Sequence, residues 1–154
     1  QGRVIWRAKP QKRLVMSRAG AAIVTNMLEG VIKEGTGRRA RILGRAVAGK
    51  TGTTNDSKDA LFIGFSPQAI AGVWVGRDAG GSLGNKETGA RAALPIWIDF
   101  MKAALQNEPH QYFDIPDDVS LIRMDPLTGL AQPDGSKRSV MALFKKGTEP
   151  VERR

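Results

Sequence analysis

Apolar residues near the start of the chain recur with the period of an α-helix. In residues 17–35, SRAGAAIVTNMLEGVIKEG, they form two rows that advance four residues at a time: Ile23, Met27 and Val31, and beside them Val24, Leu28 and Ile32. This spacing predicts an amphipathic helix whose wide apolar face belongs to the core. Ser17 is a suitable N-cap, and Lys33 followed by Gly35 is typical of a last helical turn with its glycine stop.

The pattern then changes to the period of a β-strand. Three segments are rich in alternating or β-favouring residues, and they are 45–54, 59–66 and 69–77. Turn-forming residues separate them, with Asn55 and Asp56 after the first segment and Pro67 after the second. Parallel neighbours would need a long crossover connection, which these short links do not supply. The three segments therefore predict an antiparallel meander.

A second helix is predicted after a glycine-rich loop. The loop, AGGSLGNKETGAR at 79–91, is long enough to gate a site or simply to be mobile, and the sequence leaves both interpretations open. Pro95 suits the first turn of a helix over 92–106. The predicted apolar face of this helix consists of Ala93, Trp97, Phe100, Met101 and Ala104. We expect the helix to cover one face of the sheet, with Trp74 and Trp97 as core aromatic residues.

The last third of the chain is punctuated by prolines and predicts a small separate unit. Two short apolar pieces, VSLIRM and VMALF, are typical of strands, and DPLTG at 125–129 is a turn signal between them. The predicted fold class is α+β. Residues 1–108 form an antiparallel sheet of three strands covered by helices, and residues 109–154 form a β-rich C-terminal extension that wraps back on it.

Composition and charge narrow the classes of function. The 154 residues carry 24 Lys and Arg against 15 Asp and Glu, and the net charge of +9 favours anionic partners. The basic residues are scattered without interleaved aromatic residues, so a solvated basic surface is favoured over nucleic-acid binding. No cysteine is present and His110 is the single histidine, so we expect neither a metal site nor a cofactor. No apolar run approaches the roughly 20 residues of a membrane span.

The stretch AGKTGTTND, residues 48–56, satisfies the spacing of a phosphate-binding loop. Gly44 lies five residues before Gly49, which gives GRAVAGKT. That loop needs an apolar strand before its first glycine and a helix that opens at the lysine. Here arginines precede Gly44, and glycine, asparagine and aspartate follow Lys50. The stretch therefore predicts a strand that runs through the lysine.

A Lys-Thr-Gly triplet on such a strand is suited to an anionic ligand. The ammonium of Lys50 supplies positive potential, the hydroxyl of Thr51 donates a hydrogen bond, and Gly52 lets a ligand approach the backbone closely. Side chains alternate along a strand, so Thr53 returns a hydroxyl to the face of Thr51, about 7 Å away. Two such hydroxyls could flank a carboxylate.

The chain resembles the C-terminal half of the transpeptidase domain of a bifunctional class A penicillin-binding protein. The resemblance covers most of the chain and rests on six stretches in order: MLEGVIKEGTGRRA at 27–40, KTGTT at 50–54, DALFIGFSP at 59–67, AGVWVGRD at 71–78, AALPIW at 92–97 and FKKGTEP at 144–150. It implies a partial fold of the serine β-lactamase and penicillin-binding-protein type. It also implies a peptidoglycan D,D-transpeptidase or carboxypeptidase that β-lactams acylate.

By this resemblance, the KTG motif has defined roles. Lys50 would be the catalytic lysine that keeps the site positive and supports proton transfer, and Thr51 and Thr53 would bind the terminal carboxylate of a stem peptide or a β-lactam. The backbone N–H of Thr53 would complete the oxyanion hole. Gly52 would keep the strand open, and Thr54 is placed with the substrate-binding residues.

The other two motifs of the resembled family, Ser-x-x-Lys and Ser-x-Asn, do not occur around any serine of this sequence. Acyl transfer needs the nucleophile, its base and the oxyanion donors together, so we expect the nucleophile serine in an N-terminal remainder of the same protein. That remainder would include a glycosyltransferase domain and an anchor on the periplasmic face of the inner membrane. Leu61 stands where the family more often has tryptophan, which affects packing rather than chemistry.

Two further classes of function stay open. One is a β-lactam hydrolase or sensor with the same site, and the other is a non-enzymatic anion-binding module. Asp56 and Asp59 could serve as an acid and base pair, but a role in the turn and strand start is favoured.

Overall fold

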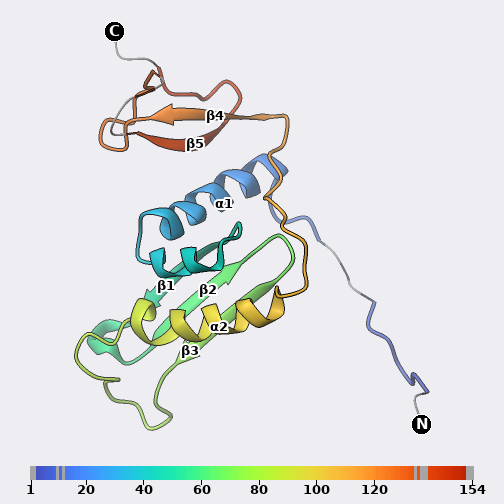
Figure 1. Ribbon diagram of the computed structural model, residues 1–154, viewed down its shortest axis with the longest axis vertical. Helices are drawn as coiled ribbons and strands as arrows, with labels where there is room; N and C mark the ends of the chain where they lie inside the picture. Colours follow the sequence, from blue (N-terminus) through green and yellow to red (C-terminus); the bar gives the residue numbers. More distant parts are fainter. Residues whose placement is uncertain (1–2, 10, 12, 134, 136–138, 152–154) are drawn as a thin grey trace.

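Three layers make up the molecule, and they lie along its long axis in Figure 1. The computed structural model describes residues 3–9, 11, 13–133, 135 and 139–151. A three-stranded sheet with helix α2 lies at one end, helix α1 in the middle and a two-stranded sheet at the other end. The described part of residues 3–16 contains no helix or strand and extends away from these layers (Figure 1).

Helix α1 spans Arg18–Lys33, close to the predicted limits. The Ser17 side chain caps it by accepting a hydrogen bond from the Gly20 N–H at 3.1 Å. Its buried residues are Ala19, Ala22 and Ile32. The predicted apolar face is only partly in the core, because Val24 and Met27 are 42% and 68% exposed. The helix contacts β1 and β5, and Val24 and Met27 stay exposed to solvent.

The three central strands are β1 (Ala48–Thr53), β2 (Ala60–Phe65) and β3 (Ile70–Val75). They form an antiparallel sheet in the order β1-β2-β3, which confirms the predicted meander. Two short 3₁₀ turns flank β1, namely η1 at Arg38–Leu43 and η2 at Asn55–Ser57. Among the described residues β1 and β3 each have a strand on one side only, so both are edge strands.

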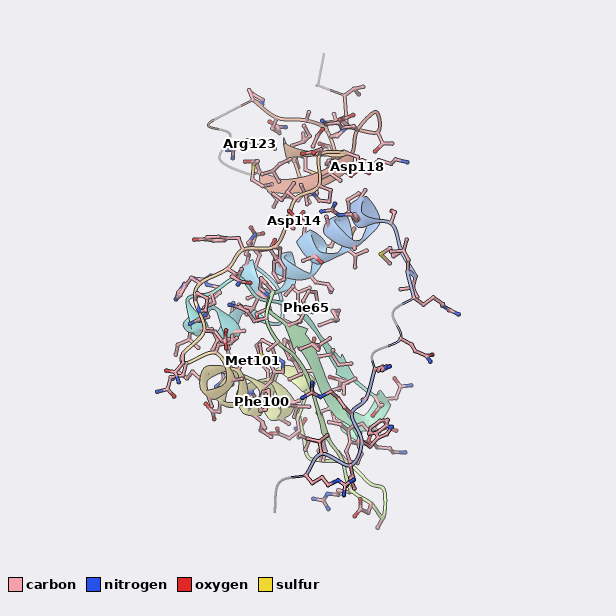
Figure 2. The ribbon with its side chains drawn as sticks, turned by 90° about the vertical axis from the view of Figure 1, so that its right-hand side faces the viewer. Phe65, Phe100, Met101, Asp114, Asp118 and Arg123 are labelled. Atoms are coloured by element: carbon pink, nitrogen blue, oxygen red, sulfur yellow. The ribbon has the colours of Figure 1, made fainter. Side chains whose placement is uncertain are left out.

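One face of the sheet is covered by α2 (Leu94–Ala104) and the π-helical turn η3 (Gly89–Ala93) that precedes it. Trp97 is fully buried there, packs edge-to-face on Phe62 at 4.9 Å, and donates from Nε1 to the carbonyl oxygens of Gly64 and Ala71. The fully buried Met101 follows on the same helix (Figure 2). Phe100 and Ala104, predicted on this face, are exposed.

The opposite face of the sheet has no covering helix among the described residues. Paired residues of neighbouring antiparallel strands share a face, so the pairing of Lys50 with Ile63 and of Ile63 with Gly72 puts these residues on this second face. Trp74 lies two residues beyond Gly72 on β3, so it belongs to the same face. We name it the open face. Trp74 is 57% exposed on it, so the prediction that Trp74 belongs to the core is wrong for this chain. Alternation along β3 directs its side chain away from α2.

The C-terminal extension folds as a hairpin-like sheet against α1. Strands β4 (Val119–Met124) and β5 (Val140–Lys145) pair antiparallel, and Val119 and Leu143 bury against the alanines of α1. The DPLTG turn is present, since Gly129 N–H donates to the Asp125 carbonyl at 2.9 Å. In Figure 2 the linker with Asp114 joins this sheet to the rest.

Replacing Trp97 by phenylalanine is expected to lower the free energy of unfolding by about 2–4 kcal/mol, since the smaller ring leaves a cavity and two carbonyl groups lose their donor. Urea denaturation measures the change. Phe100→Leu on the exposed side of the same helix is the control, with an expected loss below about 1 kcal/mol. Equal losses in the two variants would contradict the assignment of the core.

Glu149 gives the hairpin a dependence on pH. Hydrogen bonds from its own backbone N–H and from the Ser120 hydroxyl at 2.8 Å lower the pKa of its carboxyl group below the usual 4.5. Because the pKa is lower in the folded than in the unfolded protein, the ionised Glu149 carboxylate stabilises the fold, and this stabilisation is complete above the unfolded pKa. It is lost as the pH falls through the folded pKa.

We therefore expect an NMR titration of Glu149 to give a midpoint below that of an unfolded peptide, and Glu149→Gln to remove this acid-sensitive contribution. A midpoint equal to the peptide value would disprove the effect.

Candidate functional site

The Lys-Thr-Gly triplet lies on edge strand β1, as the sequence predicts. Lys50 pairs with Ile63 and Thr51 with Phe62, so the lysine belongs to the open face and the threonine to the face toward α2. No helix begins at Lys50, and Gly44 instead ends η1 in a left-handed conformation. A phosphate-binding loop is therefore excluded.

The Lys50 side chain is exposed and stays close to its own strand. Its Nζ donates to the carbonyl oxygen of Thr51 at 2.8 Å and lies 3.5 Å from the Thr51 hydroxyl. An ammonium has three hydrogens to donate, so at least one remains for a further partner on the open face. The positive charge sits where a ligand beside the strand edge would meet it.

Thr51 has a hydrogen-bond partner that the sequence did not suggest. Its hydroxyl lies 2.8 Å from the hydroxyl of Thr36, in the GTG turn between α1 and η1. Only one hydrogen occupies the space between two hydroxyl oxygens, so the pair keeps the other hydrogen for a third group. Thr36 is thus a candidate site residue. Thr36 lies inside the stretch 27–40 that contributes to the family resemblance, but no sequence pattern connects it to Thr51.

Thr53 is held from the side of α2. The backbone N–H of Gly89, at the start of η3, donates to the Thr53 hydroxyl oxygen at 3.0 Å. Because that oxygen accepts this bond, the hydroxyl keeps its own hydrogen for an anionic ligand. A π-helical turn is uncommon and often marks a functional site.

Gly89 also lies close to the backbone of Gly52. A methyl group at Gly89 would collide with the carbonyl oxygens of Leu61 and Gly52, so only glycine fits between β1 and α2. The predicted loop 79–91 therefore ends as an ordered support for the triplet. Its middle is tied to the neighbouring turn as well, since Leu83 N–H donates to the Ser57 carbonyl at 2.8 Å.

Thr54, predicted among the substrate-binding residues, has a local role in the structure. Its hydroxyl oxygen accepts from the Asp59 N–H at 2.8 Å, and the hydroxyl donates to Asp59 Oδ2 at 3.3 Å. Asp59 Oδ1 accepts from Trp74 Nε1 at 3.0 Å. Asp56 contacts Lys58 at 4.0 Å instead. The two aspartates thus act in the turn and strand start, the favoured interpretation.

Other candidate sites are weaker. His110 is exposed, and in the part of the chain that the structure describes no three His, Cys, Asp or Glu side chains gather as a metal-binding group. Within the same residues, no helix combines the length and apolar character that crossing a membrane requires.

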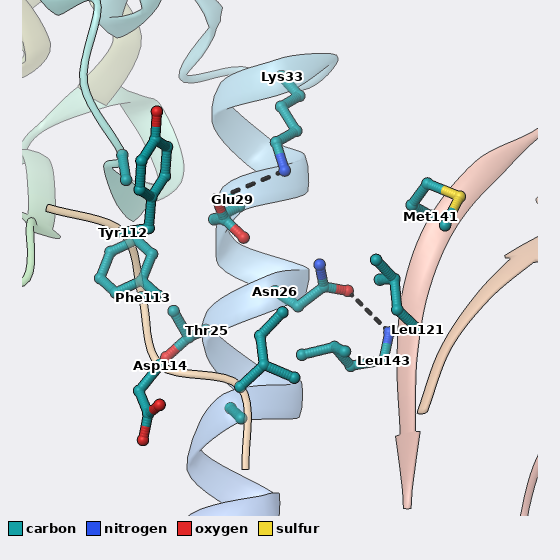
Figure 3. Close-up of a pocket in the computed structure, with 13 residues that line it drawn as sticks. Thr25, Asn26, Glu29, Lys33, Tyr112, Phe113, Asp114, Leu121, Met141 and Leu143 are labelled. Atoms are coloured by element: carbon teal, nitrogen blue, oxygen red, sulfur yellow. Dashed lines mark hydrogen bonds and ion pairs between the residues drawn. The ribbon is translucent and has the colours of Figure 1, made fainter. Parts of the chain in front are cut away.

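A cavity of about 210 Å³ lies away from β1, between α1, residues 112–115 and the hairpin (Figure 3). Two interactions between the residues of its wall are drawn there. Asn26 Oδ1 accepts from the Leu143 N–H at 3.1 Å, and Lys33 pairs with Glu29 at 3.4 Å. The cavity has no geometric link with Lys50.

Comparison with known proteins decides the family. Residues 4–94 match the family described as penicillin binding protein transpeptidase domain. The chain belongs to this family. It is 43% identical over 149 residues to penicillin-binding protein 1A of Aquifex aeolicus, and the matched region makes up 97% of this chain and 20% of the relative. It is 44% identical over 142 residues to the protein of the same name from Pseudomonas aeruginosa, which covers 92% of the chain and 17% of the relative.

A solved member of the family has the same fold. The crystal structure of penicillin-binding protein 1A from Haemophilus influenzae superposes with a TM-score of 0.80 at 34% identity, over 91% of this chain and 22% of that one. This confirms the predicted α+β transpeptidase fold with its three antiparallel strands. The chain spans about a fifth of the length of these relatives.

Gly89→Ala is expected to lower the free energy of unfolding by about 1–3 kcal/mol, because backbone atoms of β1 and β2 must move to admit the methyl group. Gly30→Ala is the matched control. That glycine lies inside α1 with open space around it, so alanine should stabilise by roughly 0.5–1 kcal/mol. Thermal unfolding compares the two, and a neutral Gly89→Ala variant would contradict the close packing.

Proposed function

We propose that the chain is the C-terminal portion of the transpeptidase domain of a peptidoglycan D,D-transpeptidase. The observation that carries the proposal is the edge strand β1, which presents an ammonium on one face and two hydroxyls on the other. In the proposed reaction a serine oxygen attacks the carbonyl carbon of the penultimate D-alanine. The amide C–N bond breaks, the serine proton reaches the leaving amine, and an acyl-enzyme remains.

In this proposal the peptide carboxylate binds the hydroxyls of Thr51 and Thr53. The hydrogen bonds already present support it, because Gly89 donates to the Thr53 oxygen and leaves that hydroxyl its hydrogen, while the Thr36–Thr51 pair keeps one hydroxyl hydrogen to donate. Thr36 is added as a third residue that positions the carboxylate. Gly52, without a side chain, lets the peptide lie along the strand.

Lys50 would raise the local positive potential and assist the proton on its way from the nucleophile. Its position on the open face supports this role, since that face has room for the nucleophile. The backbone N–H of Thr53 would donate to the carbonyl oxygen as negative charge develops there. An edge strand suits this task because its outer backbone groups have no strand partner.

The nucleophile serine would come from an N-terminal remainder of the same polypeptide. The open face supports this part of the proposal, because Ile63, Ile70 and Trp74 leave an apolar surface that water disfavours. The outer edge of β3 offers further backbone groups for a strand. We propose that the remainder covers this face, and that it carries the glycosyltransferase domain and the anchor at the periplasmic face of the membrane.

A fluorescent penicillin tests the proposal on the full-length polypeptide. Opening of the β-lactam C–N bond by the serine leaves a covalent label, and Lys50→Ala or Thr53→Ala should slow labelling by about 100-fold or more. Lys58→Ala, which changes an exposed lysine of the neighbouring turn, is the control and should label at the wild-type rate.

Unchanged labelling in the Lys50 and Thr53 variants would refute the assigned roles. Rapid loss of the label from the wild-type protein would indicate a β-lactam hydrolase instead.

A further inference from the structure

Asp59 connects the ends of all three central strands. Its backbone N–H and its carboxylate bond to Thr54, directly after β1, and its carboxylate also accepts from the indole N–H of Trp74 on β3. Asp59 itself directly precedes β2. We name these three residues the strand-end clasp.

The strand-end clasp restrains the turn that follows the Lys-Thr-Gly triplet. The Thr54 N–H donates to the Asp59 carbonyl at 3.1 Å, so the two residues are joined by backbone and side chain together. The Trp74 ring lies against Gly76, where a methyl group would collide with both the ring and the Asp59 carboxylate. The indole ring of Trp74 is therefore packed against the backbone at Gly76.

The last residue pair of β1 within the sheet is Thr53 with Ala60, and the backbone bond from Thr54 to Asp59 continues the register beyond it. An edge strand that is paired on one side frays most easily at its ends. The clasp supplies the next constraint along the chain, one residue beyond the N–H that the proposed function assigns to the oxyanion hole. A donor there must hold its place to within a fraction of an ångström.

We propose that Asp59 is a positioning residue of the transpeptidase site, which rests on the function proposed above. Through Thr54 it fixes the peptide unit between Thr53 and Thr54, which restrains the backbone of Thr53 and thereby the direction of its N–H, and Trp74 holds the Asp59 carboxylate in the orientation that this requires. The clasp does not contact the substrate. Its effect is on the developing oxyanion, and it leaves the binding of the ligand carboxylate unchanged.

This role has a kinetic signature. A displaced oxyanion donor slows both acylation and deacylation, because both pass through a tetrahedral intermediate with a negative oxygen. A disturbed carboxylate contact weakens the initial, non-covalent binding of the β-lactam instead. A purely structural defect lowers the fraction of protein that can be labelled and leaves the rate constants of the remainder alone.

The experiment compares Asp59→Asn with Asp56→Asn in the full-length protein. Both changes remove one carboxylate from the same turn, and asparagine suits the left-handed backbone of Asp56, φ 61°. At Asp59 the amide has one acceptor atom and one donor atom, so it cannot accept from both Trp74 and Thr54. Stopped-flow acylation by penicillin gives the binding constant and the acylation rate constant separately, and release of the label gives deacylation.

We expect Asp59→Asn to lower the acylation and deacylation rate constants roughly tenfold, which is less than the 100-fold or more that loss of a whole oxyanion donor costs. The binding constant should stay unchanged within about twofold. Asp56→Asn should match the wild type. Trp74→Phe, which keeps a ring but lacks the N–H, should slow both steps less, and the double variant should be no slower than Asp59→Asn alone.

Wild-type rate constants in Asp59→Asn, or a change confined to the binding constant or to the labelled fraction, would overturn the positioning role. A wild-type protein that no penicillin labels would overturn the proposed function itself, so the two failures are distinguishable.

Discussion

The arrangement of the site depends on the alternation of side chains along one edge strand. Because successive residues of β1 point to opposite faces, Lys50 lies on the open face while Thr51 and Thr53 lie toward α2. A shift of one residue in the pairing with β2 would exchange these faces. The register is secured by the buried side of the sheet, where Phe62 and Trp97 pack edge-to-face. The chemistry at the edge is thus fixed by packing in the core.

Each threonine of the strand is held by a segment that is distant in sequence. Thr36 reaches Thr51 from the turn after α1, and Gly89 reaches Thr53 from the turn before α2. These supports come from the ends of the two helices, which the core already positions. The Thr53 hydroxyl accepts from Gly89 and keeps its own hydrogen to donate, and the Thr36–Thr51 pair keeps one of its two hydroxyl hydrogens.

The two faces of the sheet are covered unequally. The face toward α2 is closed, and the other carries exposed apolar residues around Lys50. In the proposed arrangement this exposed apolar surface is the one that the remainder would cover, since burial of apolar area holds packed parts of a domain together. The chain spans about a fifth of the length of its relatives.

Periodicity, together with cap and turn residues and short links, determined the two helices, the three-strand meander and the placement of the Lys-Thr-Gly triplet on a strand, since all of these act within short stretches of sequence. The sequence also led to the family through an ordered set of motifs. Tertiary structure alone decided that Thr36 and Gly89 contact the triplet, because partners 15 and 36 residues away in sequence leave no periodic signal. It also decided that Trp74 lies on the open face and bonds to Asp59. An aromatic residue within an apolar strand has the same local pattern on either face, and only the position of α2 distinguishes them.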